Sequence, residues 1–446
     1  MNALRLLPKV DKCFTHPLFE GANATLVMKI ARGKIEEIRQ ALIHKEIESF
    51  DEEALMRHIK EEYDALFEPS LKPLINATGV ILHTNMGRSL ISKTLLDRAS
   101  DVICNYSNLE YNLEMGSRGE RYEHVSRHLQ ELLDVEDVLV VNNNASAVFL
   151  ILNTFAQNKE VVVSRGELVE IGGSFRIPEV MKQSGALLCE VGATNKTKIT
   201  DYANAINENT AMLMKVHQSN FSIEGFSEAV EYETLKQLAN NHDLLDYYDL
   251  GSGYVPKLPY NLGNREHSLS EILTCNPSLI SFSGDKLFGS VQAGIIAGRA
   301  DLIAKLKKNQ LLRMLRVDKI TLSLLEESIK AYLKEEWEHI PTLWLLFRSV
   351  EELTQRALHV KEQIGEEACE IVESETYMGG GTLPNRRFPT IALHVKGKAT
   401  ALERKFRENH VIGRIENDHF LLDFRTILPS AEDKLIEIIK LIIGTH

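Results

Sequence analysis

Between residues 134 and 300, short apolar runs rich in β-branched residues alternate with amphipathic stretches, and this alternation constrains the fold more than any other feature. Continuous apolar strands separated by helices are typical of a mostly parallel sheet that helices cover on both faces. The expected strands are 138–141, 161–163, 187–191, 212–217, 244–248, 279–282 and 294–297. The expected helices are 145–156, 199–207, 230–240 and 300–308. Such α/β sheets bind ligands at the carboxyl ends of their strands, so the residues that follow each strand are the candidates for binding and catalysis.

The two ends of the chain differ from this central region. Apolar residues recur at helical spacing over 1–66, and two prolines between Phe67 and Pro73 then break the pattern. We therefore expect a helical N-terminal domain at 1–66 and a large domain at 67–320, of which 67–90 forms a linker or arm. Strand-like stretches and a terminal helix predict a small α+β domain at 321–446.

The charge of the chain is unevenly distributed. The net charge of −12 argues against general affinity for nucleic acid. Residues 1–45, however, carry eight Lys/Arg against four Asp/Glu, whereas 46–66 carry eight Asp/Glu against two basic residues. Two interpretations stay open for the basic stretch: an ordinary solvated helix face, or a surface for an acidic partner.

Cysteine spacing and apolar run lengths exclude several classes of protein. The five cysteines are widely spaced, with no Cys-x-x-Cys, so neither a disulfide framework nor a thiolate zinc site is indicated. No His/Asp/Glu cluster has metal-ligand spacing, and we expect no metal. No apolar run approaches the roughly 18–20 residues of a membrane span, and charge and proline interrupt the N-terminus, so a cytoplasmic protein is expected.

The most informative motif is a lysine just beyond a strand, at Ser283-Gly-Asp-Lys286. One interpretation is a serine-acylating hydrolase of the penicillin-binding type, but the Ser-Asp-Asn and Lys-Thr-Gly motifs of that class are missing. Another is a lysine that carries pyridoxal 5'-phosphate, with the Ser283 hydroxyl on the cofactor phosphate. The third is an ordinary surface turn.

Two further strand ends supply what that cofactor requires. Asp249, expected directly after strand 244–248, offers a carboxylate to keep the ring nitrogen protonated. At Asn144, Ala145 and Ser146 a strand runs into a helix, whose first N–H groups favour a phosphate. Capping roles would explain each residue separately. Together with Lys286 the three features favour pyridoxal phosphate.

Longer motifs carry a resemblance to a known family. They are Asn76–Arg88, Tyr106–Tyr111, Val141–Asn144, Ser164–Pro178, Asp249–Gly253, Phe282–Lys286, Leu315–Lys319, Ile412–Ile415 and Leu422–Thr426. Over nearly its whole length the chain resembles the bacterial selenocysteine synthases, the L-seryl-tRNA(Sec) selenium transferases. The long run Ser164–Pro178 is the most specific part of this resemblance.

The resemblance implies a fold-type-I enzyme, similar to aspartate aminotransferase, that assembles from dimers into a homo-oligomer, in some members a decamer. It implies conversion of L-seryl-tRNA(Sec) to L-selenocysteinyl-tRNA(Sec) with selenophosphate. The implied course is an aldimine of the cofactor, loss of water to give aminoacrylyl-tRNA, and addition of selenium, with Lys286 as the base. Asp285 would assist proton transfer or merely cap the turn, and both roles stay open.

The resemblance also assigns roles to arginines. The seryl carboxylate is esterified to tRNA, so Arg88, Arg313 and Arg316 are expected to hold selenophosphate instead; salt bridges on a helix surface are the alternative. Ser219 and Asn220 follow strand 212–217 and are expected to contact the cofactor.

Two other functions stay open. One is a pyridoxal phosphate-dependent ammonia lyase that eliminates from a small phosphorylated substrate and would not need the segment 1–66. The other is a catalytically inactive tRNA-binding module, against which the presence of Lys286 and Asp249 argues. We expect 1–66 to bind tRNA.

Overall fold

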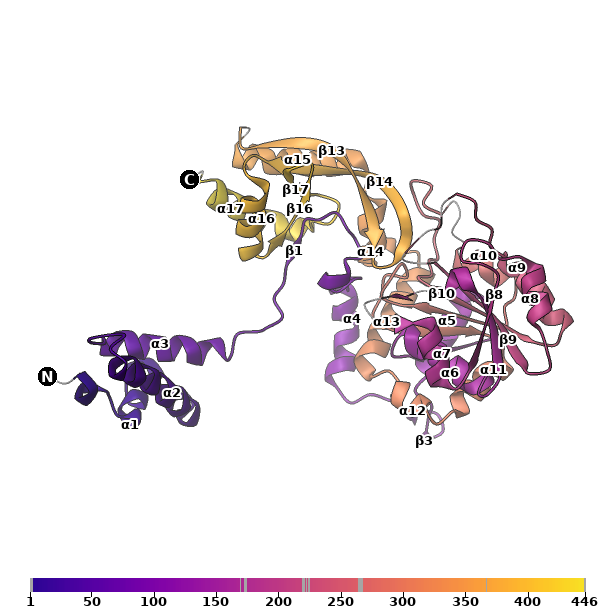
Figure 1. The fold of residues 1–446 in the computed structure, drawn as a ribbon, viewed down its shortest axis with the longest axis horizontal. Helices are drawn as coiled ribbons and strands as arrows, with labels where there is room; N and C mark the ends of the chain where they lie inside the picture. The colour runs from indigo at the N-terminus through magenta and orange to yellow at the C-terminus, as the bar shows by residue number, and fades with distance from the viewer. Residues whose placement is uncertain are drawn as a thin grey trace. The chain divides into compact units, whose positions relative to one another are not determined.

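The computed structural model describes residues 3–168, 170–171, 175–218, 221, 223, 225–263, 268–365 and 367–444. The chain forms two compact units, Met1–Pro73 and Leu74–His446 (Figure 1). We call the first unit the head. The division after Pro73 falls within the proline-containing segment that follows the last helix of the head.

The head is a small helical unit with a core of its own. Its elements are η1 (Ala3–Leu6), α1 (Val10–Phe14), η2 (Pro17–Phe19), α2 (Ala24–Ile43) and α3 (Glu52–Ala65). Asn23 caps α2 by accepting from Leu26 N (3.2 Å), and the Tyr63 hydroxyl of α3 accepts from Asn23 N (2.9 Å). The buried core residues are Cys13, Phe19, Val27, Ile30, Ala31, Ile35, Leu55, Met56 and Ile59. These contacts hold the helices of the head together without contributions from the second unit.

The second unit contains a seven-stranded sheet in the order β4-β12-β11-β10-β9-β5-β8. Its strands are β4 (Asp137–Val141), β5 (Glu160–Ser164), β8 (Leu187–Val191), β9 (Thr210–Val216), β10 (Leu245–Gly251), β11 (Leu279–Ser283) and β12 (Gly294–Gly298). All are parallel except β12, which is antiparallel to both of its neighbours. The carboxyl ends of six strands therefore meet at one edge, where a ligand site is expected.

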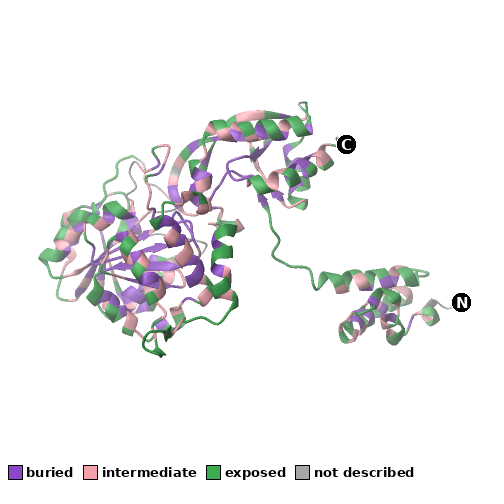
Figure 2. Cartoon of the chain, turned by 180° about the vertical axis from the view of Figure 1, so that it is seen from behind, coloured by how far each residue is buried: buried purple, intermediate pink, exposed green. Residues whose placement is uncertain are grey.

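Helices cover both faces of this sheet, and the period-2 alternation of strand residues decides which face each side chain reaches. Val138 and Val140 of β4 pack into one core with α5, α9, α10 and α13, whereas Leu139 and Val141 pack into a second core with α6, α7 and α11. These helices are α5 (Glu123–Leu133), α6 (Asn144–Phe155), α7 (Ile177–Ser184), α9 (Tyr232–Asn241), α10 (Leu269–Thr274), α11 (Ala300–Lys308) and α13 (Lys319–Leu333). Figure 2 shows the strands as a buried interior between partly exposed helices.

Shorter elements connect and extend this layer structure. They are η3 (Thr84–Met86), α4 (Lys93–Cys104), β2 (Tyr111–Asn112), β3 (Ser117–Arg118), η4 (Arg165–Glu167), β6 (Glu170–Ile171), β7 (Phe175–Arg176), α8 (Ile199–Ala205), α12 (Leu312–Leu315), η5 (Trp337–His339) and α14 (Pro341–Phe347). β2 pairs with β3 and β6 with β7, each as a two-residue antiparallel ladder.

The C-terminal part is a second layer of sheet and helices within the same unit. Its four-stranded antiparallel sheet has the order β13-β14-β17-β16. The elements are α15 (Val350–Ile364), β13 (Cys369–Gly379), β14 (Thr382–Val395), α16 (Ala399–Glu408), β15 (Val411–Ile412), β16 (Arg414–Glu416), β17 (His419–Asp423), η6 (Pro429–Ala431) and α17 (Glu432–Ile443). β1 (Ile75–Asn76) pairs in parallel with β15, and the two form a separate two-stranded sheet in the second unit.

The fold class predicted from the sequence, a mostly parallel α/β sheet with helices on both faces, is confirmed. One local prediction is wrong: Asp249 does not follow its strand but lies within β10, which continues to Gly251. β13 was not expected, and the glycine run at 379–381 is the turn that joins it to β14. Among the helices of the described residues, none is long and apolar enough to cross a membrane.

Candidate active site

Lys286 lies in the turn between β11 and the antiparallel strand β12. Gly284 N donates to Ala293 O (2.8 Å) and Gly289 N to Lys286 O (2.8 Å), so backbone hydrogen bonds fix the turn. The lysine is only 7% exposed, and burial lowers its pKa; Asp249 opposes this shift, and Arg88 adds to it. A buried lysine with a lowered pKa is more often neutral, which a lysine needs in order to act as a nucleophile or a base.

Asp249 faces this lysine from the neighbouring strand β10. Burial raises the pKa of the Asp249 carboxyl, and hydrogen bonding from Asn144 and the charge of Lys286 oppose that shift. Asn144 Nδ2 donates to Asp249 Oδ1 at 2.8 Å. The sequence had assigned Asn144 to a phosphate cradle, whereas the structure places its side chain on Asp249. Its own Oδ1 is buried and has no hydrogen-bond partner among the described residues.

The helix α6 begins at this point, directly after β4. Asn143 is its N-cap, and Asn143 Oδ1 accepts from Ser146 N at 2.8 Å. The amide of Ser146 thus already has a partner, while Ala145 occupies the first turn beside it. Gly294 of β12 makes this arrangement possible, because a Cβ on Gly294 would lie 2.1 Å from Asn143 O. The lysine turn and the start of α6 are therefore in close contact.

Asp285 links Lys286 to two other predicted residues. Its Oδ1 accepts from Ser283 Oγ (2.6 Å) and its Oδ2 from Arg88 Nη1 (3.0 Å). The Ser283 hydroxyl thus bonds Asp285 in this structure. Arg88 adopts a left-handed backbone conformation, with φ of 60°, which is uncommon for a residue other than glycine. The structure brings Ser283, Asp285 and Lys286 into one buried cluster, which the partly exposed Arg88 joins through Asp285.

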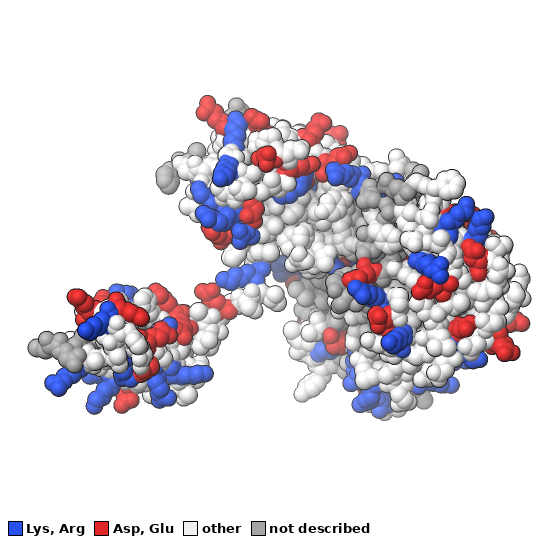
Figure 3. Space-filling view, viewed as in Figure 1, with Lys and Arg blue, Asp and Glu red and all other residues white. Residues whose placement is uncertain are grey.

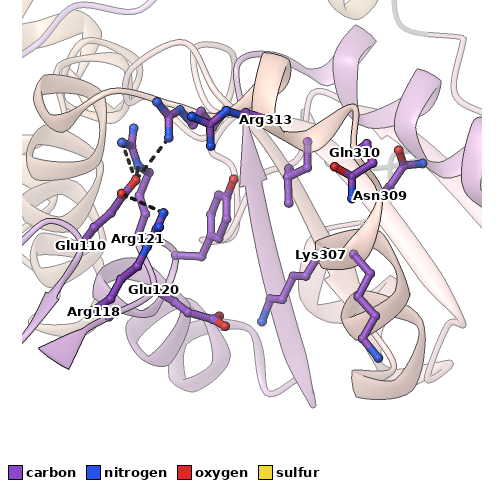
Figure 4. Close-up of a pocket in the computed structure, with 13 residues that line it drawn as sticks. Glu110, Arg118, Glu120, Arg121, Lys307, Asn309, Gln310 and Arg313 are labelled. Atoms are coloured by element: carbon purple, nitrogen blue, oxygen red, sulfur yellow. Dashed lines mark hydrogen bonds and ion pairs between the residues drawn. The ribbon is translucent and has the colours of Figure 1, made fainter. Parts of the chain in front are cut away.

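Arg313 and Arg316 line a separate cavity of about 400 Å³ (Figure 4). They do not share the face of a long helix, because α12 ends at Leu315 and Arg316 continues in extended conformation. The other lining residues are Glu110, Arg118, Gly119, Glu120, Arg121, Tyr122, Lys307, Lys308, Asn309, Gln310 and Leu312. Asn142 N, at the end of β4, donates to Leu315 O (2.9 Å), which connects this cavity wall to the start of α6.

Glu110 of this cavity was missed by the sequence analysis. It lies in the Tyr106–Tyr111 motif that carried the family resemblance, and it contacts Arg118, Arg121 and Arg316. The signal that could have found it is an acidic residue shortly before two arginines in an otherwise unassigned motif.

Two predicted residues, Ser219 and Asn220, lie outside the described residues. Their neighbour His217 donates its backbone N–H to Asp249 O (2.9 Å), so the end of β9 lies beside Asp249. Within the described part of the chain, no group of three His, Cys, Asp or Glu side chains could hold a metal ion.

Comparisons with known proteins agree with the resemblance seen in the sequence. The model of the L-seryl-tRNA selenium transferase family matches residues 74–428, which include the lysine turn, Asp249 and the arginine cavity. The L-seryl-tRNA(Sec) selenium transferase of Aliarcobacter butzleri is 56% identical over 444 residues, covering 99% of this chain and 98% of its own. That of Sulfurimonas denitrificans is 54% identical over 444 residues, covering 99% of each.

A solved structure shows the same fold at lower similarity. D-glucosaminate-6-phosphate ammonia-lyase superposes with a TM-score of 0.62 at 18% identity, over 86% of this chain and 98% of its own. That match supports the fold alone, whereas the family match and the full-length relatives carry the assignment. The chain belongs to the L-seryl-tRNA selenium transferase family.

Proposed function

We propose that this chain converts L-seryl-tRNA(Sec) to L-selenocysteinyl-tRNA(Sec), with pyridoxal 5'-phosphate carried by Lys286 and selenophosphate as the selenium donor. The observation that carries the proposal is the buried pair of Lys286 and Asp249 at the carboxyl edge of the sheet, in a chain 56% identical to a transferase of this activity. We expect the reaction in the cytoplasm, because the substrate is an aminoacyl-tRNA.

The residues present fit the cofactor. A buried lysine, a buried carboxylate and an unpartnered buried amide oxygen on Asn144 lie together, and such a set is stable only with further polar partners. Lys286 would hold the aldehyde carbon, Asp249 the ring nitrogen and the first turn of α6, at Ala145 and Ser146, the phosphate. Ser283, Ser219 and Asn220 are proposed as further cofactor contacts.

When bound, pyridoxal phosphate supplies an electron sink for the electron pair that remains when the Cα–H bond of the seryl group breaks. Lys286 in its neutral form accepts that proton, and burial together with Arg88 favours the neutral form. Asp249 in its ionised form keeps a proton on the ring nitrogen, and the hydrogen bond from Asn144 favours ionisation. Burial thus favours a neutral base at Lys286, while the hydrogen bond from Asn144 and the charge of Lys286 favour the anion at Asp249 against the effect of burial.

Asp285 is proposed to assist the proton transfers at Lys286. Ser283 and Arg88 bond both of its carboxylate oxygens, which fixes the carboxylate next to the lysine. Its negative charge raises the pKa of Lys286 against the effect of burial. Asp285 therefore limits the fall in the pKa of Lys286. The lysine can then both accept a proton and return it.

The arginine cavity is the proposed site of selenophosphate. Six of its lining side chains are basic and two are acidic, so the cavity favours an anion. Arg313 and Arg316 would bind the phosphate moiety. Arg88, which bonds Asp285 beside Lys286, is proposed as a further selenophosphate ligand. The seryl group of the substrate bears no free carboxylate for these arginines to bind.

The head is proposed to bind tRNA. Figure 3 shows its basic side chains gathered mainly along one side and its acidic side chains along the other. Lys34 and Arg39 form ion pairs with acidic neighbours. Six exposed basic residues form none with the described residues; they are Arg5, Lys9, Lys12, Lys29, Arg32 and Lys45. Basic side chains without partners bind RNA phosphates most readily.

A homo-oligomer built from dimers is also proposed, and a decamer is one form it could take. Large apolar side chains are exposed over a short stretch of the second unit, at Leu90, Ile91, Leu96, Val102, Tyr106, Leu113 and Met115. Such a concentration is typical of a surface that a second copy covers. Measurement of the solution mass by light scattering tests this.

The experiment that tests the function is single-turnover conversion of seryl-tRNA(Sec) with selenophosphate by the purified holoenzyme. We expect selenocysteinyl-tRNA(Sec). Release of ammonia from a small phosphorylated amino sugar acid, without conversion of the tRNA, would instead establish the ammonia-lyase alternative.

A further inference from the structure

Glu110 is an acidic residue shared by three arginines of the proposed donor cavity. Its Oε1 accepts from Arg121 Nη2 (2.8 Å) and Nε (3.1 Å) and lies 3.3 Å from Arg316 Nη1. Its Oε2 lies 3.5 Å from Arg118 Nη2. Figure 4 shows these contacts as dashed lines that converge on Glu110, while Arg313 has none. A cavity suited to an anion therefore already contains a carboxylate.

The three contacts differ in strength. The Arg121 side chain is 13% exposed, bonds Glu110 through two nitrogens and donates a third hydrogen bond to Val317 O (2.5 Å). Arg316 is 37% exposed and makes one long contact, and Arg118 is 77% exposed. Exposed single contacts contribute little to stability, whereas two hydrogen bonds from one largely buried guanidinium to the same carboxylate oxygen orient both partners. Arg121 thus fixes Glu110, whereas Arg316 and Arg118 can leave Glu110 and bind another anion.

We propose that Glu110 is a positioning residue that acts as an internal counter-ion: it holds Arg316 in the empty cavity and competes with the phosphate of the donor for that arginine. This inference rests on the proposed function of the cavity. An entering anion takes over Arg316, and Arg121 keeps the Glu110 carboxylate in the cavity, where it repels the anion. Glu110 thereby weakens binding and favours release of the phosphate that remains after selenium transfer.

Glu110 remains charged throughout this exchange. Hydrogen bonding from Arg121, with the charges of Arg316 and Arg118, holds the pKa of the Glu110 carboxyl below its usual value. Arg313 has no ion pair and no side-chain hydrogen bond with any described residue, so it is available to the anion from the start. An anion that enters the cavity therefore meets Arg313, which has no such contact, and Arg316, which must first leave Glu110.

The test measures the dissociation constant of inorganic phosphate for the full-length holoenzyme by calorimetry. Glu110→Gln removes the charge with little change of size, and we expect phosphate to bind about tenfold more tightly, because the anion no longer competes with a carboxylate for Arg316. Glu120→Gln is the matched control: Glu120 lines the same cavity but forms no ion pair with the described residues. Its effect should stay below about twofold.

A double-mutant cycle tests whether the effect acts through Arg316. In the Arg316→Ala background, Glu110→Gln should improve phosphate binding by less than about threefold, because the competition for that arginine is gone. A purely structural role of Glu110 predicts the opposite of the main result, since loss of a structural contact does not tighten binding. Glu110→Ala is a second variant that removes the charge and should shift the affinity in the same direction.

Equal or weaker phosphate binding by the folded Glu110 variants overturns the inference. If Arg313→Ala still weakens phosphate binding in that case, the cavity remains the donor site. If neither the wild type nor Glu110→Gln binds phosphate, the inference and the donor assignment both fail. The conversion of seryl-tRNA(Sec) by the wild type, measured separately, shows whether the enzyme activity itself stands.

Discussion

Lys286 and Asp249 each occupy a site that would be unfavourable for it alone. Burial lowers the pKa of the lysine and raises the pKa of the aspartate, and the opposite charge of the partner opposes both shifts. Removing one member of a buried pair leaves the other without compensation, which is strongly destabilising for a charge. Each member of the pair therefore depends on the other, and single substitutions test this dependence.

Replacing Lys286 should abolish the covalent attachment of the cofactor. We expect Lys286→Ala to lose the visible absorbance of lysine-bound pyridoxal phosphate and all turnover, because no other amine lies beside Asp249 in the described site. Lys286→Arg is the control, since it keeps a cation near Asp249 but forms no imine. Borohydride reduction followed by peptide mapping checks the result, and cofactor fixed to a different lysine would refute the assignment.

The hydrogen bond from Asn144 to Asp249 predicts a pH effect. Asn144→Ala removes that hydrogen bond, which lowers the pKa of Asp249 against the effect of burial. The pKa of Asp249 should therefore rise further in the variant. Asp249 holds the ring proton only when ionised, so activity is lost as pH falls through this pKa. The acid limb of kcat/KM should therefore lie at higher pH in the variant.

Asn153→Ala provides a control for that pH profile. Asn153 lies on the same helix α6 but bonds Ser184 O at the side away from Asp249. Its acid limb should coincide with that of the wild type. An unchanged profile in Asn144→Ala would show that this hydrogen bond does not set the ionisation of Asp249.

At the scale of elements, the site depends on how closely β12 approaches the start of α6. A Cβ on Gly294 would meet the Asn143 carbonyl at 2.1 Å, and backbone atoms there have no room to move. We expect Gly294→Ala to destabilise the second unit by about 1–3 kcal/mol through overpacking and to weaken cofactor retention. Urea unfolding and cofactor absorbance measure the two effects.

Gly33→Ala is the matched substitution in the head. Gly33 lies within α2, and a Cβ there meets nothing within 4 Å. Alanine should therefore raise the free energy of unfolding of the head by about 0.5–1 kcal/mol, because it reduces the backbone entropy of the unfolded chain. Equal effects of the two substitutions would contradict the close approach at Gly294.

The elements could be predicted wherever residues close in sequence decide them. The apolar runs located all seven strands of the large sheet. Six of them are largely buried, and strands buried on both faces are continuous in apolar residues, whereas the edge strand β8 is partly exposed. β13 was missed because its exposed positions carry Glu and Ser rather than a regular apolar pattern. Asp249 was placed directly after its strand rather than within it, because a buried carboxylate within a strand has no local signature.

The candidate site was predictable in its members but not in their contacts. Sequence order places Lys286, Asp249 and Asn144 near strand ends, and parallel topology brings strand ends together. That Asn144 bonds Asp249, or that Ser283 bonds Asp285, depends on side-chain directions set by packing. Glu110 was missed for the same reason, since its contact with Arg316 joins two segments that are far apart in the sequence.

At the scale of the whole molecule, the head is the part whose role can be separated from catalysis. It has its own core and ends at Pro73, so its surface can be altered without touching the sheet. We expect Lys29→Ala with Arg32→Ala to weaken tRNA(Sec) binding by about tenfold or more at low salt, and to reduce the salt dependence of binding by about two released ions. Cofactor absorbance should not change.

Lys34→Ala with Arg39→Ala is the control pair in the same helix α2. Both residues are engaged with glutamates of the head, so they contribute less to an RNA surface. Filter binding over a range of salt concentrations compares the two double variants. A larger loss in the control pair would place the RNA at Lys34 and Arg39 and reject the proposed surface.

The antiparallel strand β12 also determines when the large sheet can assemble during synthesis of the chain. β4 lies at the end of the strand order of the large sheet and pairs with β12, with Val141 opposite Gly294. On a ribosome β4 therefore emerges long before the strand that joins it to the rest. Until Gly298 has been synthesised, the α6 start with Asn144 is not anchored beside Asp249, so the nascent chain assembles its cofactor site in one late step.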